Sequence, residues 1–151
     1  AMSTIEKIIE EFGERTGIAG FALDADGTCV LSFDDIVVNL ELVRDKARLY
    51  AFTVITLMPD DDVQAMALCR YALEQNLSLA ISGAGILGLS QQHGLLFANS
   101  VGTEQLDLTA FEAFLETHVN VSEGLRQATQ AIGAETPATD AAILQGMALR
   151  V

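Results

Sequence analysis

Basic side chains are scarce in this sequence of 151 residues. It has eight Lys and Arg residues against 21 Asp and Glu residues, which gives a formal net charge of −13. So negative a surface repels the phosphate backbone of nucleic acids and anionic lipid headgroups. The one basic cluster, formed by Arg44, Lys46 and Arg48, is too small to reverse that field. We therefore expect neither nucleic acid nor a membrane surface as a partner.

A hydrophobic run long enough to cross a bilayer is also missing. The longest apolar stretch, residues 77–89, is interrupted by Ser78, Ser82 and three glycines, whereas a membrane-spanning helix needs about 20 apolar residues. The chain begins with a charged amphipathic segment, which predicts that no signal peptide is present. Because half of the residues are hydrophobic, the sequence indicates a folded cytoplasmic domain.

Only two cysteines and two histidines are present, and tryptophan is absent. Cys29 and Cys69 lack both C-x-x-C spacing and a neighbouring histidine, so buried reduced thiols are the favoured interpretation, with a disulfide or a metal pair as the alternative. His93 and His118 are isolated from any cysteine or serine that could act as a nucleophile. The sequence thus predicts neither an enzyme nor a metal or cofactor site.

Three consecutive acidic residues follow Pro59. Asp60, Asp61 and Asp62 stand where a helix begins, and negative side chains there stabilise the partial positive charge of the helix N-terminus. A divalent-metal site is the alternative, but it would need further oxygen ligands at defined spacing. We interpret the three as a helix start.

Hydrophobic periodicity and turn residues predict eight elements. Ser3 and Glu6 have the spacing of a capping box, and Gly17 is expected to end the first helix. Thr109 and Glu112 give a second possible capping box before the last helix, which is expected to end at Gly133. The predicted order is helix 3–16, strands 28–33, 36–42 and 48–58, a helix from the three aspartates to residue 75, strands 77–89 and 94–101, and helix 109–132.

This order predicts a single α+β domain over residues 1–133, with a twisted antiparallel five-stranded sheet and three helices, α-β-β-β-α-β-β-α. Strand 36–42 alternates apolar and polar residues, which is typical of a half-buried strand. Residues 134–151 are expected to form a C-terminal tail with at most one short helix over residues 140–147.

Residues 83–88 match the dinucleotide fingerprint G-x-G-x-x-G. That chemistry requires a helix that opens on the glycines and presents its backbone N–H groups to a pyrophosphate. Glu104 lies at a suitable distance for the acidic partner of the motif, but Gly94 and the β-prone residues around it favour a hairpin. We expect a glycine-punctuated strand and no nucleotide site.

The middle helix carries two apolar stripes. One can pack into the core and consists of Ala65, Leu68, Cys69, Ala72 and Leu73. The other, which contains Val63, Met66 and Tyr71, favours a partner surface, with a merely broad core face as the alternative. Strand 48–58 also has more apolar surface than one sheet face requires. These features indicate a binding module, dimeric through the middle helix, for an apolar or extended polypeptide.

The sequence resembles the class I chaperones of bacterial type III secretion, of the Tir-chaperone type, over about residues 3–132. The resemblance rests on the element order together with the segments "IIEEFGERTGI", "LDADGTCVLSFDD" leading into "VVNLEL", "ALEQNL", "GAGILGLSQQHGLLF" and "LDLTAFEAFLETHVNVSEGLR". It implies a cytoplasmic homodimer that uses no ATP and holds the N-terminal segment of a secreted effector in an extended form.

The resemblance also implies two sets of site residues, in which core and contact residues are not separated. Effector contacts are expected at Ile5, Ile8, Phe12, Phe21, Leu31, Phe33, Val38 and Tyr50. The dimer contact is expected at Val63, Met66, Arg70, Tyr71, Ile81, Gly83, Gly85 and Leu87, with Gly83 and Gly85 nearest to the partner.

Two other functions stay open at this point. A protein of the same fold could sequester a secretion regulator and so control transcription, and the sequence does not separate this role from effector binding. A nucleotide-binding or enzymatic α+β domain would rest on the glycines at 83–88 alone.

Overall fold

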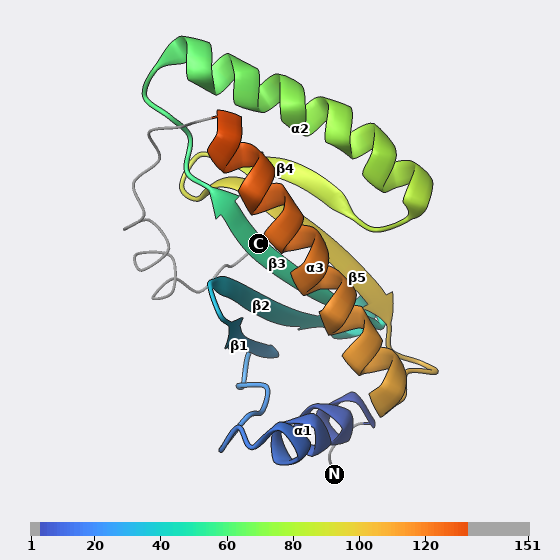
Figure 1. Cartoon of the computed structure of the whole chain (residues 1–151). Helices are drawn as coiled ribbons and strands as arrows, with labels where there is room; N and C mark the ends of the chain where they lie inside the picture. Colours follow the sequence, from blue (N-terminus) through green and yellow to red (C-terminus); the bar gives the residue numbers. More distant parts are fainter. Residues whose placement is uncertain (1–3, 133–151) are drawn as a thin grey trace.

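A five-stranded antiparallel sheet with the strand order β1-β2-β3-β5-β4 forms the centre of the computed structural model, which describes residues 4–132 (Figure 1). The predicted order of helices and strands is confirmed. The tail expected over residues 134–151 lies outside the described residues, as does Ser3 of the first capping box. The elements are α1 Thr4–Thr16, β1 Thr28–Phe33, β2 Ile36–Val43, the 3-10 turn η1 Arg44–Lys46, β3 Arg48–Thr56, α2 Asp62–Ser82, β4 Ile86–Ser90, β5 Gly94–Gly102 and α3 Leu108–Ile132.

All three helices contribute to a core on one side of the sheet. α3 crosses the sheet, with α1 beside its N-terminal half and α2 beside its C-terminal half (Figure 1). One cluster joins Ile9 of α1 and Phe111 of α3 to β2 and β3. The second joins Leu68 of α2 and Leu125 of α3 to Phe97 of β5. The helices therefore cover one face of the sheet, and side chains such as Tyr50 lie on the other.

The pairing of β2 with β3 ends at Asn39 and Phe52. Beyond this point the Thr53 hydroxyl donates to the carbonyl oxygen of Val37 at 2.8 Å, so a side chain replaces a bond of the ladder. Val37 and Asn39 are 7% and 5% exposed. The expectation of a half-buried β2 is therefore wrong for its first half, because both faces of this part of the strand are covered.

Side-chain caps fix where the two long helices begin. The Asp61 carboxylate accepts the backbone N–H of Gln64 at 2.9 Å, which confirms the acidic start of α2. At α3 the capping residue is Asp107, which accepts the N–H of Ala110 at 2.8 Å. The capping box expected at Thr109 is thus wrong by two residues, because α3 already begins at Leu108.

Helix α2 is longer than predicted. It continues to Ser82 and ends at Gly83, which has φ 72°. The backbone N–H of Gly83 donates to the carbonyl oxygen of Ala80 and so caps the helix. Residues 77–82, expected as strand, are therefore helical. The reason is that Leu79 lies on the same helical face as Leu68 and Ala72, so continuing the helix buries it in the second cluster.

Candidate functional site

The described residues contain no cluster of side chains suited to metal binding. Among residues 4–132 no three His, Cys, Asp or Glu side chains are placed to hold a metal ion. None of the helices in this range is long and apolar enough to span a membrane. The candidate functional surfaces are exposed apolar residues and grooves.

The geometry at residues 83–88 is opposite to that of a phosphate loop. Helix α2 ends at Gly83, and β4 begins at Ile86. The glycines therefore meet the C-terminal end of a helix, which carries exposed carbonyl groups and partial negative charge. An anionic phosphate is repelled by this arrangement.

Gly85 is required by the fold of its own chain. Its φ is 144°, and a Cβ there would overlap the carbonyl oxygen of Ala98 and lie 2.9 Å from the Phe97 ring. The expectation that Gly83 and Gly85 lie in a strand is wrong, because Gly83 is the C-cap of α2 and β4 begins only at Ile86. Close approach at Gly85 is to β5 of the same chain.

A continuous apolar stripe runs along the solvent side of α2. Its residues are spaced three or four apart, the pattern of a helix seam that packs against another helix. Arg70 is the one charged residue within it, and Ile86 and Leu89 of β4 add further exposed apolar surface. The apolar members on α2 are Val63, Met66, Leu73, Leu77 and Ile81, which are between 59% and 80% exposed.

The residues expected at a dimer contact divide into two groups. Val63, Met66, Arg70, Ile81 and Gly83 are exposed. Tyr71 is half-buried against the second core cluster, and Leu87 is 4% exposed, so neither offers a full side chain to a partner. Leu73, Leu77, Ile86 and Leu89 are exposed as well. Leu73 was expected on the core stripe, which is wrong because its side chain is 72% exposed.

An apolar groove lies between α1, β1 and α3. It has a volume of about 220 Å³, and the side chains of Phe12, Phe33, Leu115 and Val119 line it together with Glu112. Arg15 of α1 lies 3.3 Å from the Glu112 carboxylate. The groove can therefore receive an apolar side chain, next to an ion pair that joins the two helices.

The sequence matches the Tir chaperone protein (CesT) family over residues 7–126. The chain belongs to this family. Comparison with curated protein sequences gives no significant match.

Solved structures similar to this CesT-family fold include several complexes. The ExsC–ExsE complex gives a TM-score of 0.70 with 21% identity, covering 82% of this chain and 91% of the other. The HopA1–SchA chaperone–effector complex gives 0.66 with 18% identity over 82% and 93%. The Yersinia pestis type III secretion chaperone SycH, in complex with a fragment of YscM2, gives 0.60 with 21% identity over 81% and 99%. These similarities establish the fold.

Most residues expected to contact an effector form the core of this CesT-family chain. Phe33 and Tyr50 are partly exposed, and of the two only Phe33 reaches the groove between α1 and α3. The spacing of apolar residues in α1 and β1 predicts one apolar face on each element. Such a face can be buried in the core or can contact a partner, and the sequence alone does not separate these two roles. The remaining six, Ile5, Ile8, Phe12, Phe21, Leu31 and Val38, are at most 8% exposed.

Two titratable side chains in the core are held in their neutral forms. Burial, with a smaller effect of Asp24, raises the pKa of the Cys29 thiol to about 12. Burial lowers the pKa of His118 to about 3. Cys29 and Cys69 are both free thiols. Neither Cys29 nor His118 is therefore poised for proton transfer or nucleophilic attack near neutral pH.

Proposed function

We propose that this protein is a type III secretion chaperone in the bacterial cytoplasm, which binds the N-terminal segment of a secreted effector as a homodimer. Membership of the CesT family over residues 7–126 is the observation that carries the proposal. Structural neighbours described as chaperone complexes support it. In this role the protein keeps its partner soluble and secretion-competent, with no nucleotide, metal or catalytic step.

The apolar stripe on α2 is the proposed centre of the homodimer. Such a stripe is costly to leave in water and has the spacing of a helix seam. Its midpoint lies near Ala72, so two antiparallel α2 helices would bring Val63 of each protomer to Ile81 of the other. The same antiparallel arrangement sets Arg70 across from Glu74, whereas a parallel one would set two Arg70 side chains against each other. Charge therefore favours the antiparallel pair.

Effector side chains are proposed to enter the groove between α1, β1 and α3. Four of its lining side chains are apolar, and Phe33 is one of those that are partly exposed. On the sheet face away from the helices, Tyr50 and Phe52 stack with their ring centroids 6.1 Å apart and offer a second apolar surface. The acidic remainder of the surface keeps the complex soluble.

Copurification followed by limited proteolysis tests the proposal. The tagged protein is purified from its native host, the bound protein is identified by mass spectrometry, and its N-terminal region is digested with and without the chaperone. We expect a dimer by light scattering and a protected N-terminal segment in a secreted protein. A monomer that protects no segment of any copurified protein would overturn the proposal.

Sequestration of a secretion regulator is the alternative use of the same surfaces. The apolar stripe and the groove would serve either partner, so the identity of the copurified protein separates the two. A partner that is a transcriptional regulator or its antagonist, rather than a secreted effector, would favour the alternative.

A further inference from the structure

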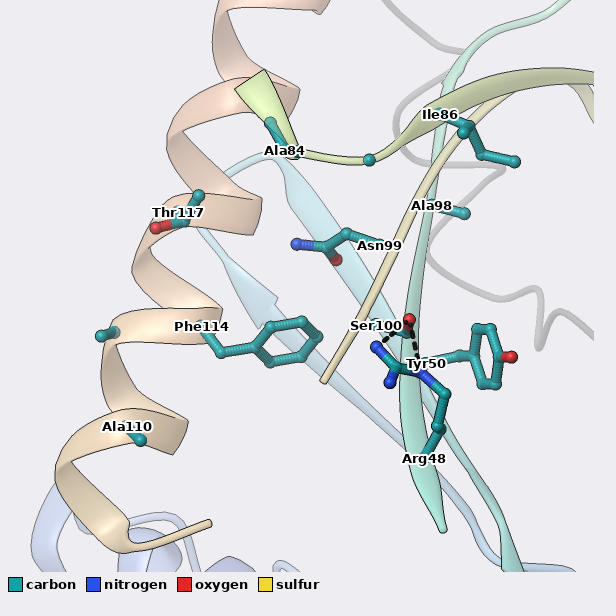
Figure 2. Close-up of a pocket in the computed structure, with 13 residues that line it drawn as sticks. Arg48, Tyr50, Ala84, Ile86, Ala98, Asn99, Ser100, Ala110, Phe114 and Thr117 are labelled. Atoms are coloured by element: carbon teal, nitrogen blue, oxygen red, sulfur yellow. Dashed lines mark hydrogen bonds between the residues drawn. The ribbon is translucent and has the colours of Figure 1, made fainter. Parts of the chain in front are cut away.

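We propose that the free end of β5 binds an extended segment of the partner in which an acidic residue is flanked by apolar residues, with Arg48 as the specificity-determining residue. This inference rests on the proposed function, since it names a chemical feature of the polypeptide that the chaperone binds. The site comprises the outer edge of β5 at residues 100–102, Arg48 and Tyr50 of β3, and Phe114 of α3 (Figure 2).

The outer edge of β5 is unpaired beyond Ala98. Its ladder with β4 ends at the pair of Ile86 and Ala98, although β5 continues to Gly102. The carbonyl oxygen of Ala98 faces Gly85 on the β4 side, and the Thr103 N–H donates to Ala47 on the β3 side at 2.9 Å. Backbone groups alternate in direction along a strand.

It follows from this alternation that Ser100 and Gly102 direct their backbone N–H and C=O groups outward. Within residues 4–132 no strand pairs with this edge. An unpaired row of this kind is a template for an added strand.

A hollow of about 550 Å³ lies beside this edge. The turn between α2 and β4, at residues 83–85, closes one end of it, and Ala110, Ala113 and Phe114 of α3 line one side. Figure 2 shows the Phe114 ring directed from α3 toward β5. A second hollow of about 480 Å³ continues past Gly102 and shares Arg48 and Ala110 with the first. The edge and the two hollows together have room for a short extended peptide.

Arg48 is fixed in this hollow without a carboxylate partner. Its Nε and Nη2 atoms donate to Ser100 Oγ at 3.0 and 2.9 Å (Figure 2). Among the described residues the ion pairs within 4.0 Å are formed by Arg15 and Arg44, not by Arg48. Glu104, the carboxylate that lines the adjoining hollow with Lys46, is not within that distance of either cation.

A held guanidinium with unused donors, in a chain of net charge −13, is complementary to a carboxylate supplied by a partner. Because Arg48 is already positioned by Ser100, little side-chain entropy is lost when the carboxylate binds.

The pleat of the sheet fixes the order of residues in the bound segment. Side chains directly opposite each other in paired strands lie on the same face. A residue opposite Ser100 therefore points to the face where Arg48 and Tyr50 lie. Its two neighbours point to the helix side, toward Phe114 and Ala113. The preferred segment thus reads apolar, acidic, apolar.

Peptide binding followed by NMR tests this inference on the full chain. The probes are acetyl-Lys-Ser-Val-Glu-Val-Ser-Lys-amide and the same peptide with Gln in place of Glu. We expect the Glu peptide to shift the amide signals of Ser100 and Gly102 and to bind about tenfold more tightly than the Gln peptide. General attraction to the acidic protein would favour the more positive Gln peptide, so the expected preference opposes that background.

Two variants that each remove one positive charge test whether Arg48 causes the preference for the Glu peptide. Arg48→Gln is expected to bind both peptides alike, whereas Lys7→Gln, on the exposed side of α1, keeps the tenfold difference. Equal binding of the two peptides to the unmodified protein would overturn the inference, as would signal shifts away from Ser100 and Gly102. If Arg48→Gln does not fold, the affinities of the unmodified protein for the two peptides still test the inference.

Failure here is distinguishable from failure of the proposed function. A protein that protects its copurified partner from protease but binds both peptides alike would retain the chaperone role and lose this site. A protein that protects no partner would lose the chaperone role, whatever its peptide preference.

Discussion

His118 of α3 lies between Thr53 of β3 and Asn99 of β5. Its Nε2 atom is 2.7 Å from Thr53 Oγ1, and its Nδ1 atom is 2.7 Å from Asn99 Oδ1. Thr53 Oγ1 also lies 2.8 Å from the Val37 carbonyl oxygen, and the His118 ring packs against Phe97 with the ring centroids 5.1 Å apart. A buried polar chain thus joins the long helix to three neighbouring strands.

The buried His118 side chain makes the free energy of unfolding depend on pH. Because burial lowers the pKa of His118 from 6.5 to about 3, the unfolded state takes up a proton more readily than the folded state. The stabilisation is fully present above pH 6.5 and is lost as the pH falls toward 3. We expect a loss of about 2 kcal/mol between pH 6.5 and 5 from this group.

Urea unfolding at fixed protein concentration, repeated at several pH values, measures this effect. His118→Leu should be less stable at pH 7, because the Thr53 hydroxyl and the Asn99 side chain each lose a hydrogen bond to the ring. It should nevertheless show a pH dependence weaker by about 2 kcal/mol over the same range. An identical pH dependence in both proteins would contradict the assignment.

Gly85→Ala is expected to destabilise the fold itself. The added Cβ would overlap the backbone of β5, and the positive φ of 144° is unfavourable for any residue with a side chain. We expect a loss of about 2 kcal/mol or more in the free energy of unfolding. Gly88→Ala is the matched control in β4, because a Cβ there meets no atom within 4 Å. Equal effects of the two substitutions would show that close packing at Gly85 does not matter.

Leu77→Glu is expected to weaken the proposed homodimer. Leu77 is 67% exposed within the α2 stripe, and a buried unpaired carboxylate in a helix seam is costly. The dissociation constant should rise at least about a hundredfold, measured by sedimentation equilibrium. Ser78→Glu adds the same charge to the neighbouring exposed position and should change it little. A fully dimeric Leu77→Glu protein would argue against this seam.

A charge exchange tests the antiparallel orientation of the two α2 helices. Arg70→Glu and Glu74→Arg should each weaken dimerisation by about tenfold, since each sets like charges against each other. The double variant restores opposite charges and should recover most of the lost affinity. If the double variant is weaker than either single one, the helices do not meet in this register.

The element order could be predicted from sequence because each signal is local. The Asp61 cap, the Gly17 stop and the alternation in β1 depend on residues within a few positions of one another. The error at residues 77–82 has a different origin. The apolar run there is compatible with either a strand or a helix. The helix forms because it allows Leu79 to pack into the core beneath α2.

The candidate site could be predicted only in part. Val63 and Met66 were identified because they lie opposite the core stripe of the same helix, a relation fixed by helical geometry. The six effector candidates that proved to be core could not be separated from contacts, since burial is a property of the assembled sheet and helices. The pairing of Arg48 with Ser100 brings together residues 52 positions apart, which no local pattern reports.

The sequence by itself determined the acidic character, the fold class, the resemblance to secretion chaperones and the helix that carries the exposed stripe. The resemblance rests on the element order and on several short segments, and the other features follow from composition and from periodicities over a few residues. Only the tertiary structure decided that Gly83 ends a helix, that Gly85 packs against β5 and that His118 bridges two strands. It also decided that β5 extends beyond the end of its pairing with β4. Each of these depends on where one segment ends relative to another that is distant in the chain, and that relation is set when the segments pack together.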